Sequence, residues 1–318
     1  MENRIIKSGF VSIIGLPNAG KSTFLNAVIK ENIAITSKKP QTTRKNIKGI
    51  YNDDNSQIVF IDTPGIHKAK SKLDEFMEAS INNSMQDVDV IIVIVDSVTY
   101  MSDDYKKIIT LIEKSKSKKI LLINKIDVFV KINNIDKNDG SIYEKSLKDL
   151  KKKILNKFDS NINFDKIIEI SALKRKSIGN VISEIKLLLN EGQPFYDNDY
   201  ITDEPMKQIV ADIIRKHCLY KLDKEVPHGL TVVVDSMKES KSKCMYINAT
   251  IVCERDTHKG IIIGKGGFMI KNIGTGARIE IEKLVDNKVN LKLNVIVKEN
   301  WKDERTLLAN YGYDIKNI

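Results

Sequence analysis

The first part of the chain alternates short apolar runs with longer, mixed stretches. The apolar runs are rich in β-branched residues, are followed by turn-forming residues, and cover positions 10–14, 58–61, 90–95, 120–123 and 167–170. Short continuous apolar runs of this kind are typical of strands buried on both faces of a parallel sheet. Helical stretches separate most of them. We therefore predict an α/β domain over residues 1–192, with a doubly wound and mostly parallel sheet.

The pattern changes after residue 192. Residues 193–205 contain Pro194, Pro205 and a cluster of Asp and Asn, which is typical of a linker. Beyond it, apolar positions at helical spacing cover 206–214, and two strand-like runs follow at 230–234 and 245–252. A glycine-rich loop at 261–267, a helical stretch at 268–284 and a strand of strict period two at 289–297 complete the pattern. This order predicts a smaller α+β domain at 206–318.

Composition narrows the class of protein. The chain has 318 residues and only 3 Cys, with no CxxC pair, which argues against a disulfide scaffold and a cysteine metal site and fits a reducing compartment. The longest apolar run, 90–95, is far shorter than the ~18–20 residues of a membrane helix. The first ten residues contain no apolar signal region. We expect a cytoplasmic protein.

Charge adds a hint about partners. The chain carries 52 Lys+Arg and 42 Asp+Glu, a formal net charge of +10, which indicates a polyanionic partner. Residues 1–195 account for +8 of this excess, with 32 basic and 24 acidic residues, and residues 196–318 for +2. Within the second part, segment 255–278 has five basic residues and one acidic residue. Because affinity for phosphates depends on the charges that meet them, this local excess is the relevant one.

A phosphate-binding motif lies near the N-terminus. Residues 15–22, GLPNAGKS, match GxxxxGK[ST], and they follow an apolar run and precede a helical stretch, as the motif requires. Its glycines let backbone N–H groups point at phosphate oxygens, and the helix N-terminus adds a favourable dipole. We expect Lys21 to neutralise the β- and γ-phosphates and Ser22 to bind Mg²⁺. The predicted phosphate-binding residues are Gly15, Leu16, Pro17, Asn18, Ala19, Gly20, Lys21, Ser22 and Thr23.

A second motif, DTPG at 62–65, follows the next apolar run. A carboxylate at the end of a strand is well placed to hold Mg²⁺, directly or through water, so Asp62 is a predicted metal ligand. Gly65 permits close approach of the backbone to the γ-phosphate. Alone, these four residues would be an ordinary turn. After a phosphate-binding loop they predict a sensor of the γ-phosphate.

Two further segments can read a base. In NKID at 124–127, Asp127 can accept hydrogen bonds from guanine N1–H and N2–H₂, which adenine lacks, at a cost of about 1–3 kcal/mol for the wrong base. Lys125 can lie along the base plane, and Asn124 can tie this loop to the phosphate loop. In the next segment, Ser171, Ala172 and Leu173, the Ala172 N–H can donate to guanine O6. Together the motifs predict binding of GTP or GDP rather than of adenine nucleotides.

The chain resembles the Era family of GTPases, which act on the small ribosomal subunit. The resemblance spans nearly the whole length and rests on GLPNAGKS, QTTR at 41–44, DTPG, NKID, SAL, TDEP at 202–205, EVPH at 225–228 and ERDTHKG at 254–260 leading into IIIGKGG. Residues 129–149 show no family pattern. The resemblance implies that QTTR is switch I and that Thr43 or Thr42 binds Mg²⁺ in the GTP state; we favour Thr43.

The resemblance also bears on hydrolysis. Ras-like GTPases place a water-orienting Gln directly after DxxG, and this chain has Ile66 there, so no general base is predicted. We expect slow intrinsic turnover driven by electrostatic stabilisation from Lys21, Mg²⁺ and backbone amides. Related GTPases with Asn at the position of Asn18 use it to hold K⁺ beside the phosphates; a purely local packing role for Asn18 is the alternative. Lys21 and Asn18 are thus the candidate catalytic residues.

A second glycine loop predicts RNA binding. Residues 264–267, GKGG, fit the GxxG loop of a KH domain, and the element order resembles the type II KH fold. In such a module the loop contacts consecutive phosphates of a single strand while an adjacent groove reads bases. The family resemblance implies the 3′ end of small-subunit ribosomal RNA as ligand. The predicted RNA-binding residues are Arg255, Lys259, Gly264, Lys265, Gly266, Gly267, Lys271 and Arg278.

These features predict a monomeric, GTP-hydrolysing switch that binds ribosomal RNA and the 30S subunit and assists its assembly. The resemblance adds peripheral association with the inner face of the cell membrane. Two alternatives stay open. One is a constitutive RNA-binding module whose nucleotide serves only structure, and the other is a membrane-peripheral signalling GTPase.

Overall fold

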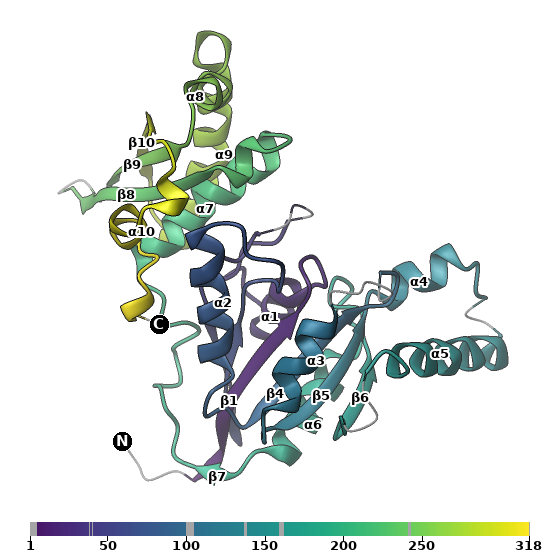
Figure 1. Cartoon of the computed structure of the whole chain (residues 1–318). Coiled ribbons are helices and arrows are strands. Elements are labelled where there is room, and N and C mark those ends of the chain that lie inside the picture. Colours follow the sequence, from purple (N-terminus) through teal and green to yellow (C-terminus); the bar gives the residue numbers. More distant parts are fainter. Residues whose placement is uncertain are drawn as a thin grey trace. The chain divides into compact units, whose positions relative to one another are not determined.

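The computed structural model describes residues 5–37, 39, 41–99, 105–136, 139–158, 162–240 and 243–317 (Figure 1). The chain divides into two compact units. The first consists of the described residues of 1–34, 43–68 and 77–203, and the second of those of 35–42, 69–76 and 204–318. The segment 195–203 belongs to the first unit, where the ring of Phe195 lies 4.6 Å from that of Phe10 and the backbone N–H of Ile50 donates to Ile201 O.

The first unit is built on one twisted sheet. Its strands are β1 (Ile6–Gly15), β2 (Ile47–Asp53), β3 (Ser56–Asp62), β4 (Val90–Asp96), β5 (Lys118–Asn124), β6 (Lys166–Glu169) and β7 (Glu191–Gly192). They follow the order β2-β3-β1-β4-β5-β6, and β7 pairs with β1. The pairs β3–β1, β1–β4, β4–β5 and β5–β6 are parallel, whereas β2–β3 and β1–β7 are antiparallel.

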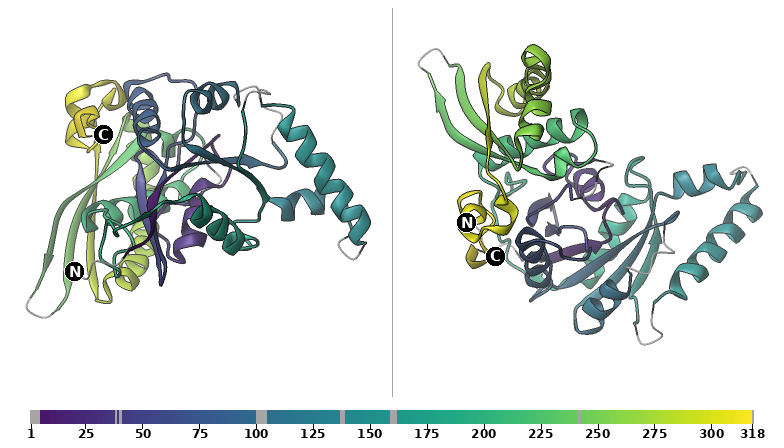
Figure 2. Two further views of the ribbon diagram at one scale, coloured as in Figure 1. Left: turned by 90° about the horizontal axis from the view of Figure 1, so that it is seen from below. Right: turned by 45° about the horizontal axis from the view of Figure 1, so that its top comes forward.

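Helices cover both faces of this sheet (Figures 1 and 2). They are α1 (Lys21–Ile29), α2 (Lys72–Ser84), α3 (Tyr105–Glu113), α4 (Ile126–Ile132), α5 (Gly140–Leu155) and α6 (Ile178–Leu188). One buried cluster joins α1 and α6 to one face through residues such as Phe24 and Ile185. A second joins α3 and α5 to the other face through Ile108 and Ile154. The two-sided cover confirms the predicted doubly wound α/β fold.

All five predicted strands are present, and two additional ones are not visible in the apolar pattern. Strand β2 was not predicted because Lys48 and Gly49 interrupt its apolar residues. It is also an outer strand, where fewer positions need to be apolar. Strand β7 is only two residues long, too short to show a pattern of apolar residues.

The second unit contains a three-stranded sheet in the order β10-β9-β8. Its elements are α7 (Met206–Lys221), β8 (Leu230–Glu239), β9 (Met245–Cys253), α8 (Asp256–Ile263), α9 (Phe268–Val285), β10 (Val289–Val297) and α10 (Arg305–Asn310). The pair β10–β9 is parallel and β8–β9 is antiparallel. Ile214, Ile251 and Ile273 are fully buried in a core shared by the helices and the sheet. The order α-β-β-α-α-β is that of a type II KH domain.

Helix α8 was not predicted. Its last turn is the run Ile261–Ile263, which has β-branched residues and leads into glycines, a combination that favours a strand and a loop. Among the described residues, no helix combines the length and apolar character needed to span a membrane.

Candidate nucleotide and RNA sites

The carboxyl ends of the parallel strands bring the first set of motifs to one edge of the sheet. The strand β1 ends at Gly15, β3 at Asp62, β4 at Asp96 and β5 at Asn124. Ser171 follows shortly after β6. In open α/β sheets, ligands bind in the crevice outside these strand ends. The motifs that are far apart in sequence therefore meet at the place where this fold binds ligands.

The phosphate loop has the geometry that its sequence demands. Gly20 has a φ of +101°, and a Cβ there would lie 2.2 Å from Asn124 Nδ2, so only glycine fits. The side chain of Lys21 is buried, and its ammonium donates to the carbonyls of Gly15 and Leu16 at 3.1 Å each. Burial lowers the pKa of Lys21 to about 8, against the opposing effect of the Asp62 carboxylate. Asn18, with a φ of 62°, is exposed on the loop.

The three predicted metal ligands lie together. Ser22 Oγ donates to Asp62 Oδ2 at 2.6 Å, Thr43 Oγ1 lies 2.9 Å from Ser22 Oγ, and Thr43 Oγ1 donates to Asp62 Oδ2 at 3.3 Å. Asp62 Oδ1 is buried and has no hydrogen-bond partner. Burial raises the pKa of Asp62 to about 6, although Lys21 and the two hydroxyls oppose it. Three oxygen donors with one buried carboxylate oxygen left unsatisfied fit a hard cation such as Mg²⁺.

The two threonines of the segment 41–44 are placed differently. Thr42 Oγ1 donates to the carbonyl of Lys39 at 2.7 Å, whereas Thr43 Oγ1 reaches the cluster of Ser22 and Asp62. This placement supports the preference for Thr43 as the metal ligand.

The DTPG segment and the residue after it are hydrogen-bonded to the end of β1, where the phosphate loop begins. The Ile66 N–H donates to Gly15 O at 3.3 Å, and Thr63 Oγ1 donates to Ile13 O at 2.7 Å. The side chain of Ile66 is buried. The position that carries a water-orienting Gln in Ras-like GTPases therefore supplies no hydrogen-bonding side chain here.

The base-reading segments are joined to each other and to the phosphate loop by Asn124. Its Nδ2 donates to Ala19 O at 2.9 Å, and its Oδ1 accepts from the Ala172 N–H at 3.0 Å. Ser171 Oγ donates to Asp127 Oδ1 at 2.6 Å, which orients this carboxylate. The Asp127 side chain is half-exposed. Leu173, also predicted to contact nucleotide, is 74% exposed beside them. The segments can thus present one rigid surface to a purine.

Sequence reasoning missed one charged residue at this edge. Lys125 Nζ lies 2.7 Å from Asp96 Oδ2, the last residue of β4, and the Asp96 side chain is only 7% exposed. The sequence feature that could have pointed to Asp96 is its position directly after an apolar run, which it shares with Asp62.

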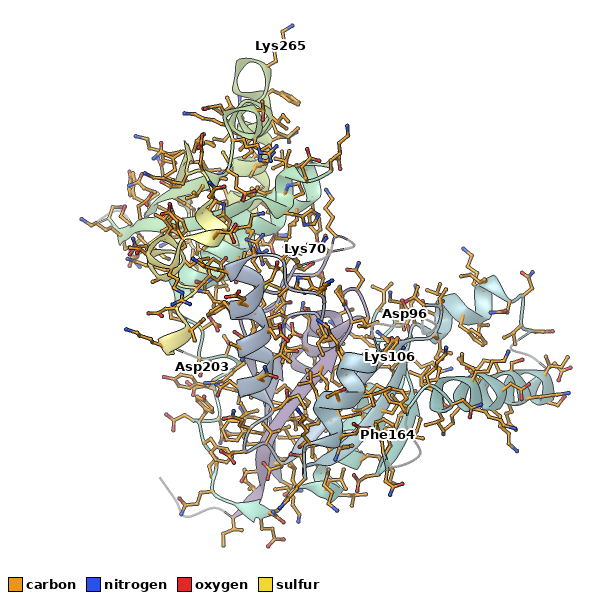
Figure 3. All side chains as sticks on the ribbon, in the orientation of Figure 1. Lys70, Asp96, Lys106, Phe164, Asp203 and Lys265 are labelled. Carbon is orange, nitrogen blue, oxygen red and sulfur yellow. The ribbon has the colours of Figure 1, made fainter. Side chains whose placement is uncertain are left out.

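In the second unit, the GxxG loop joins α8 to α9. Gly264 has a φ of +73°, and a Cβ there would lie 2.9 Å from the backbone N of Met269, so the chain can turn into α9 only with glycine. Gly266 and Gly267 also have positive φ. Lys265 is exposed, and Figure 3 shows its side chain pointing away from the tip of the loop. The N-terminus of α9 begins directly after the loop, at Phe268.

The other predicted RNA-binding residues fall on α8 and α9 or at their ends. Arg255 precedes α8, Lys259 lies on it, and Lys271 is exposed on α9. Arg278 is paired with Glu282 at 2.8 Å, so part of its charge is neutralised within the helix. Two apolar side chains that the sequence reading passed over, Ile261 and Phe268, are 49% and 68% exposed beside the loop. An exposed aromatic ring such as that of Phe268 can stack on a base.

Comparisons with known proteins agree with this geometry. Residues 10–125 match the family model of a 50S ribosome-binding GTPase, and residues 225–302 match a KH domain. The chain is 43% identical to GTPase Era of Clostridioides difficile strain 630, over 98% of this chain and 100% of that protein. It is 42% identical to GTPase Era of Thermoanaerobacter sp. strain X514, over 97% of each.

Two crystal structures of Era are similar over almost the whole chain. One is Era in complex with MgGDPNP and nucleotides 1506–1542 of 16S ribosomal RNA, with a TM-score of 0.89, 31% identity, and coverage of 97% of this chain and 99% of that one. The other is an Aquifex aeolicus Era variant bound to GDP and AlF₄⁻, with a TM-score of 0.86, 31% identity, and coverage of 97% and 100%. The chain belongs to the Era family of GTPases.

Proposed function

We propose that this protein is a GTP-hydrolysing switch that binds small-subunit ribosomal RNA near its 3′ end and assists assembly of the small subunit. The observation that carries the proposal is the presence, on one chain, of a guanine-nucleotide site and a KH loop. A relative similar along 97% of this chain has been solved with MgGDPNP and a 16S ribosomal RNA fragment. The proposed nucleotide-binding residues lie at 15–23, 43, 62, 65, 124, 125, 127 and 171–173, and the proposed RNA-binding residues lie between 255 and 278.

Hydrolysis follows from electrostatics rather than from a base. Lys21 is held by two carbonyls at the phosphate loop, where its ammonium can stabilise charge that develops on the β- and γ-phosphates. Mg²⁺ held by Ser22, Thr43 and Asp62 would add positive charge at the same phosphates. With Ile66 in place of a polar side chain, nothing there orients the attacking water, and slow intrinsic turnover is the expected result.

Potassium is the second proposed ion. Asn18 is exposed on the phosphate loop with a left-handed backbone, and its amide oxygen can ligate K⁺ beside the phosphates. Turnover is then faster in potassium chloride than in sodium chloride at equal ionic strength, and Asn18→Ala removes the difference. Equal rates in the two salts in the unaltered protein contradict this role.

RNA binding is proposed to depend on the nucleotide. GTP favours the RNA-competent state and hydrolysis releases the RNA. Filter binding of a small-subunit RNA 3′ fragment, with GDP and with a non-hydrolysable GTP analogue, tests this. Identical affinities contradict the coupling. Turnover near zero with RNA and potassium present would instead indicate a constitutive RNA-binding module.

The proposed setting is the cytoplasm, as a monomer that engages the 30S subunit, with peripheral attachment to the inner membrane face. Flotation with liposomes of anionic lipid tests the attachment, and sedimentation equilibrium tests the monomer. Strong flotation without any RNA binding would favour the membrane-peripheral signalling GTPase.

The central experiment is crosslinking to ribosomal RNA with mapping of the sites. We expect crosslinks near the 3′ end, which are lost when Lys265→Asp is combined with Gly266→Asp. Lys283→Asp is the matched control, because Lys283 is exposed at the opposite end of α9. Crosslinks that persist in the double variant contradict RNA binding by the GxxG loop.

A further inference from the structure

One buried carboxylate at the nucleotide edge of the sheet is not among the predicted nucleotide-binding residues. Asp96, which is labelled in Figure 3, is the last residue of β4. Strand β4 pairs in parallel with β5 (Figure 1), and the register partner of Asp96 is Asn124. Its side chain is 7% exposed. Burying an ionised carboxylate is unfavourable unless a partner compensates it. The partner is Lys125, whose ammonium lies 2.7 Å from Asp96 Oδ2.

The ion pair is one of several links between the ends of β4 and β5. The Ser97 N–H donates to Asn124 O at 2.9 Å, and Ser97 Oγ donates to Lys125 O at 3.1 Å. The second carboxylate oxygen of Asp96 accepts from the Val98 N–H at 2.8 Å, which closes the turn after β4. Residues 96 and 97 therefore bind both the backbone and the Lys125 side chain of the base-reading segment 124–127.

Lys125 needs such support. Its φ is 64°, a left-handed conformation that is unfavourable for a residue with a side chain, and it begins α4 without a side-chain cap. Its side chain is 33% exposed, and a free lysine in that position would sample many rotamers. A base that stacks along the lysine stem binds more tightly when the stem is already fixed, since the ordering cost is then met in the free protein.

We propose that Asp96 is a positioning residue for guanine nucleotides, which fixes the Lys125 side chain along the face of the base pocket. The inference rests on the proposed binding of guanine nucleotides by the segments 124–127 and 171–173. Asp96 touches no substrate atom in this role. It acts through Lys125, so it affects how tightly the base is held and leaves the phosphate chemistry unchanged.

The test is Asp96→Asn, which removes the charge but keeps an oxygen that can accept from the Val98 N–H. We expect the dissociation constants for fluorescent GDP and GTP analogues to rise about tenfold, as for loss of one charge-assisted contact. KM for GTP rises with them, and kcat at saturating GTP is unchanged. Asp96→Glu, which restores the charge, recovers most of the affinity.

Two comparisons separate positioning from a general loss of structure. In a Lys125→Met background, Asp96→Asn has no further effect on GDP affinity, because the pair is already broken. The ratio of GDP to IDP affinity is the same in Asp96→Asn as in the unaltered protein, because Asp127 and not Lys125 meets the guanine amino group. Asp165→Asn is the matched control, a charge removal at the far end of β5, where Asp165 pairs with Lys118, and it leaves both constants unchanged.

The outcomes are distinct. If the unaltered protein binds no guanine nucleotide, the proposed function fails. If it binds but Asp96→Asn binds equally well, the positioning role is wrong. A fall in kcat without a change in KM, or a full effect of Asp96→Asn in the Lys125→Met background, also overturns it.

Discussion

Two glycine loops of the molecule are proposed to bind phosphates, and they are built in opposite ways. In the phosphate loop, Lys21 is 6% exposed and held by two carbonyls, and Gly20 lies against the Asn124 amide. In the GxxG loop, Lys265 is exposed, and a Cβ at Gly266 or Gly267 would meet nothing within 4 Å. Only Gly264 is sterically confined there.

The difference matches the ligands. A small anion that must react needs groups fixed in advance on every side, because preorganised donors in a dry site are worth more than mobile ones. A flexible strand has many phosphates and is held by contacts that follow the backbone, so an exposed loop with a mobile charge is sufficient. The degree of burial thus differs between the two loops in the direction expected for the ligands proposed for them.

The largest expected effect is that of Gly20→Ala. A Cβ at this position meets Asn124 Nδ2 at 2.2 Å and must adopt a φ of +101°, so both the phosphate loop and the base-reading loop are displaced. We expect GDP affinity to fall by about 100-fold or more, measured by titration with fluorescent GDP. Gly140→Ala is the control, because a Cβ there meets nothing within 4 Å. Near-normal binding by Gly20→Ala would mean that the loop is not a rigid cradle.

The next effect separates the two switch threonines. Thr43→Val removes a hydroxyl that lies with Ser22 and Asp62, and Thr42→Val removes one that donates only to the carbonyl of Lys39. We expect Thr43→Val to lower kcat at limiting Mg²⁺ by about tenfold or more and Thr42→Val to change it little. A magnesium titration of GTP turnover makes the measurement. Equal effects of the two substitutions would contradict the assignment of Thr43.

A smaller effect is expected from Gly264→Ala. The added Cβ meets the backbone N of Met269 at 2.9 Å, so the loop must shift relative to α9. We expect RNA affinity to fall about tenfold, a strain of ~1–2 kcal/mol, while GDP affinity is unchanged. Gly260→Ala, four residues earlier and in open space, is the control. Unchanged RNA affinity in Gly264→Ala would mean that the contacts to phosphate lie elsewhere.

The local motifs indicate candidate sites whose residues lie together in the structure, whereas the framework around them was predicted less completely. The motifs at 15–22, 62–65 and 124–127 each depend on a few residues with fixed backbone demands, and the fold brings them to one edge. What the sequence could not give was the pairing of side chains between strands. The Asp96–Lys125 pair requires β4 and β5 to be adjacent and in register, and a residue that ends an apolar run carries no sign of its partner.

The framework itself was predicted where periodicity was strong. Fully buried strands such as β4 produce continuous apolar runs, whereas β2 mixes polar and apolar residues. Helix α8 was missed because three isoleucines in succession fit a strand as well as a helix; in the helix that forms, Ile262 is fully buried. The turn at Gly264 could be predicted only from the GxxG motif.

The smallest expected effect concerns the helix that carries the GxxG loop. Glu280 on α9 is bonded to two side chains of α7, through Lys216 Nζ at 2.6 Å and His217 Nε2 at 3.0 Å. The hydrogen bond from His217, aided by Lys216, lowers the pKa of Glu280 from 4.5 to about 2. A carboxyl whose pKa is lower in the folded state adds stability above its unfolded pKa and loses it as the pH falls.

We therefore expect Glu280→Gln to lower the free energy of unfolding at pH 7 by about 1–2 kcal/mol, and this deficit to shrink between pH 4.5 and about 2. Urea titrations across this range make the measurement. Glu282→Gln, which breaks the more exposed pair with Arg278 on the same helix, is the comparison and costs less. A deficit that is independent of pH would contradict a stabilising role for the charge of Glu280.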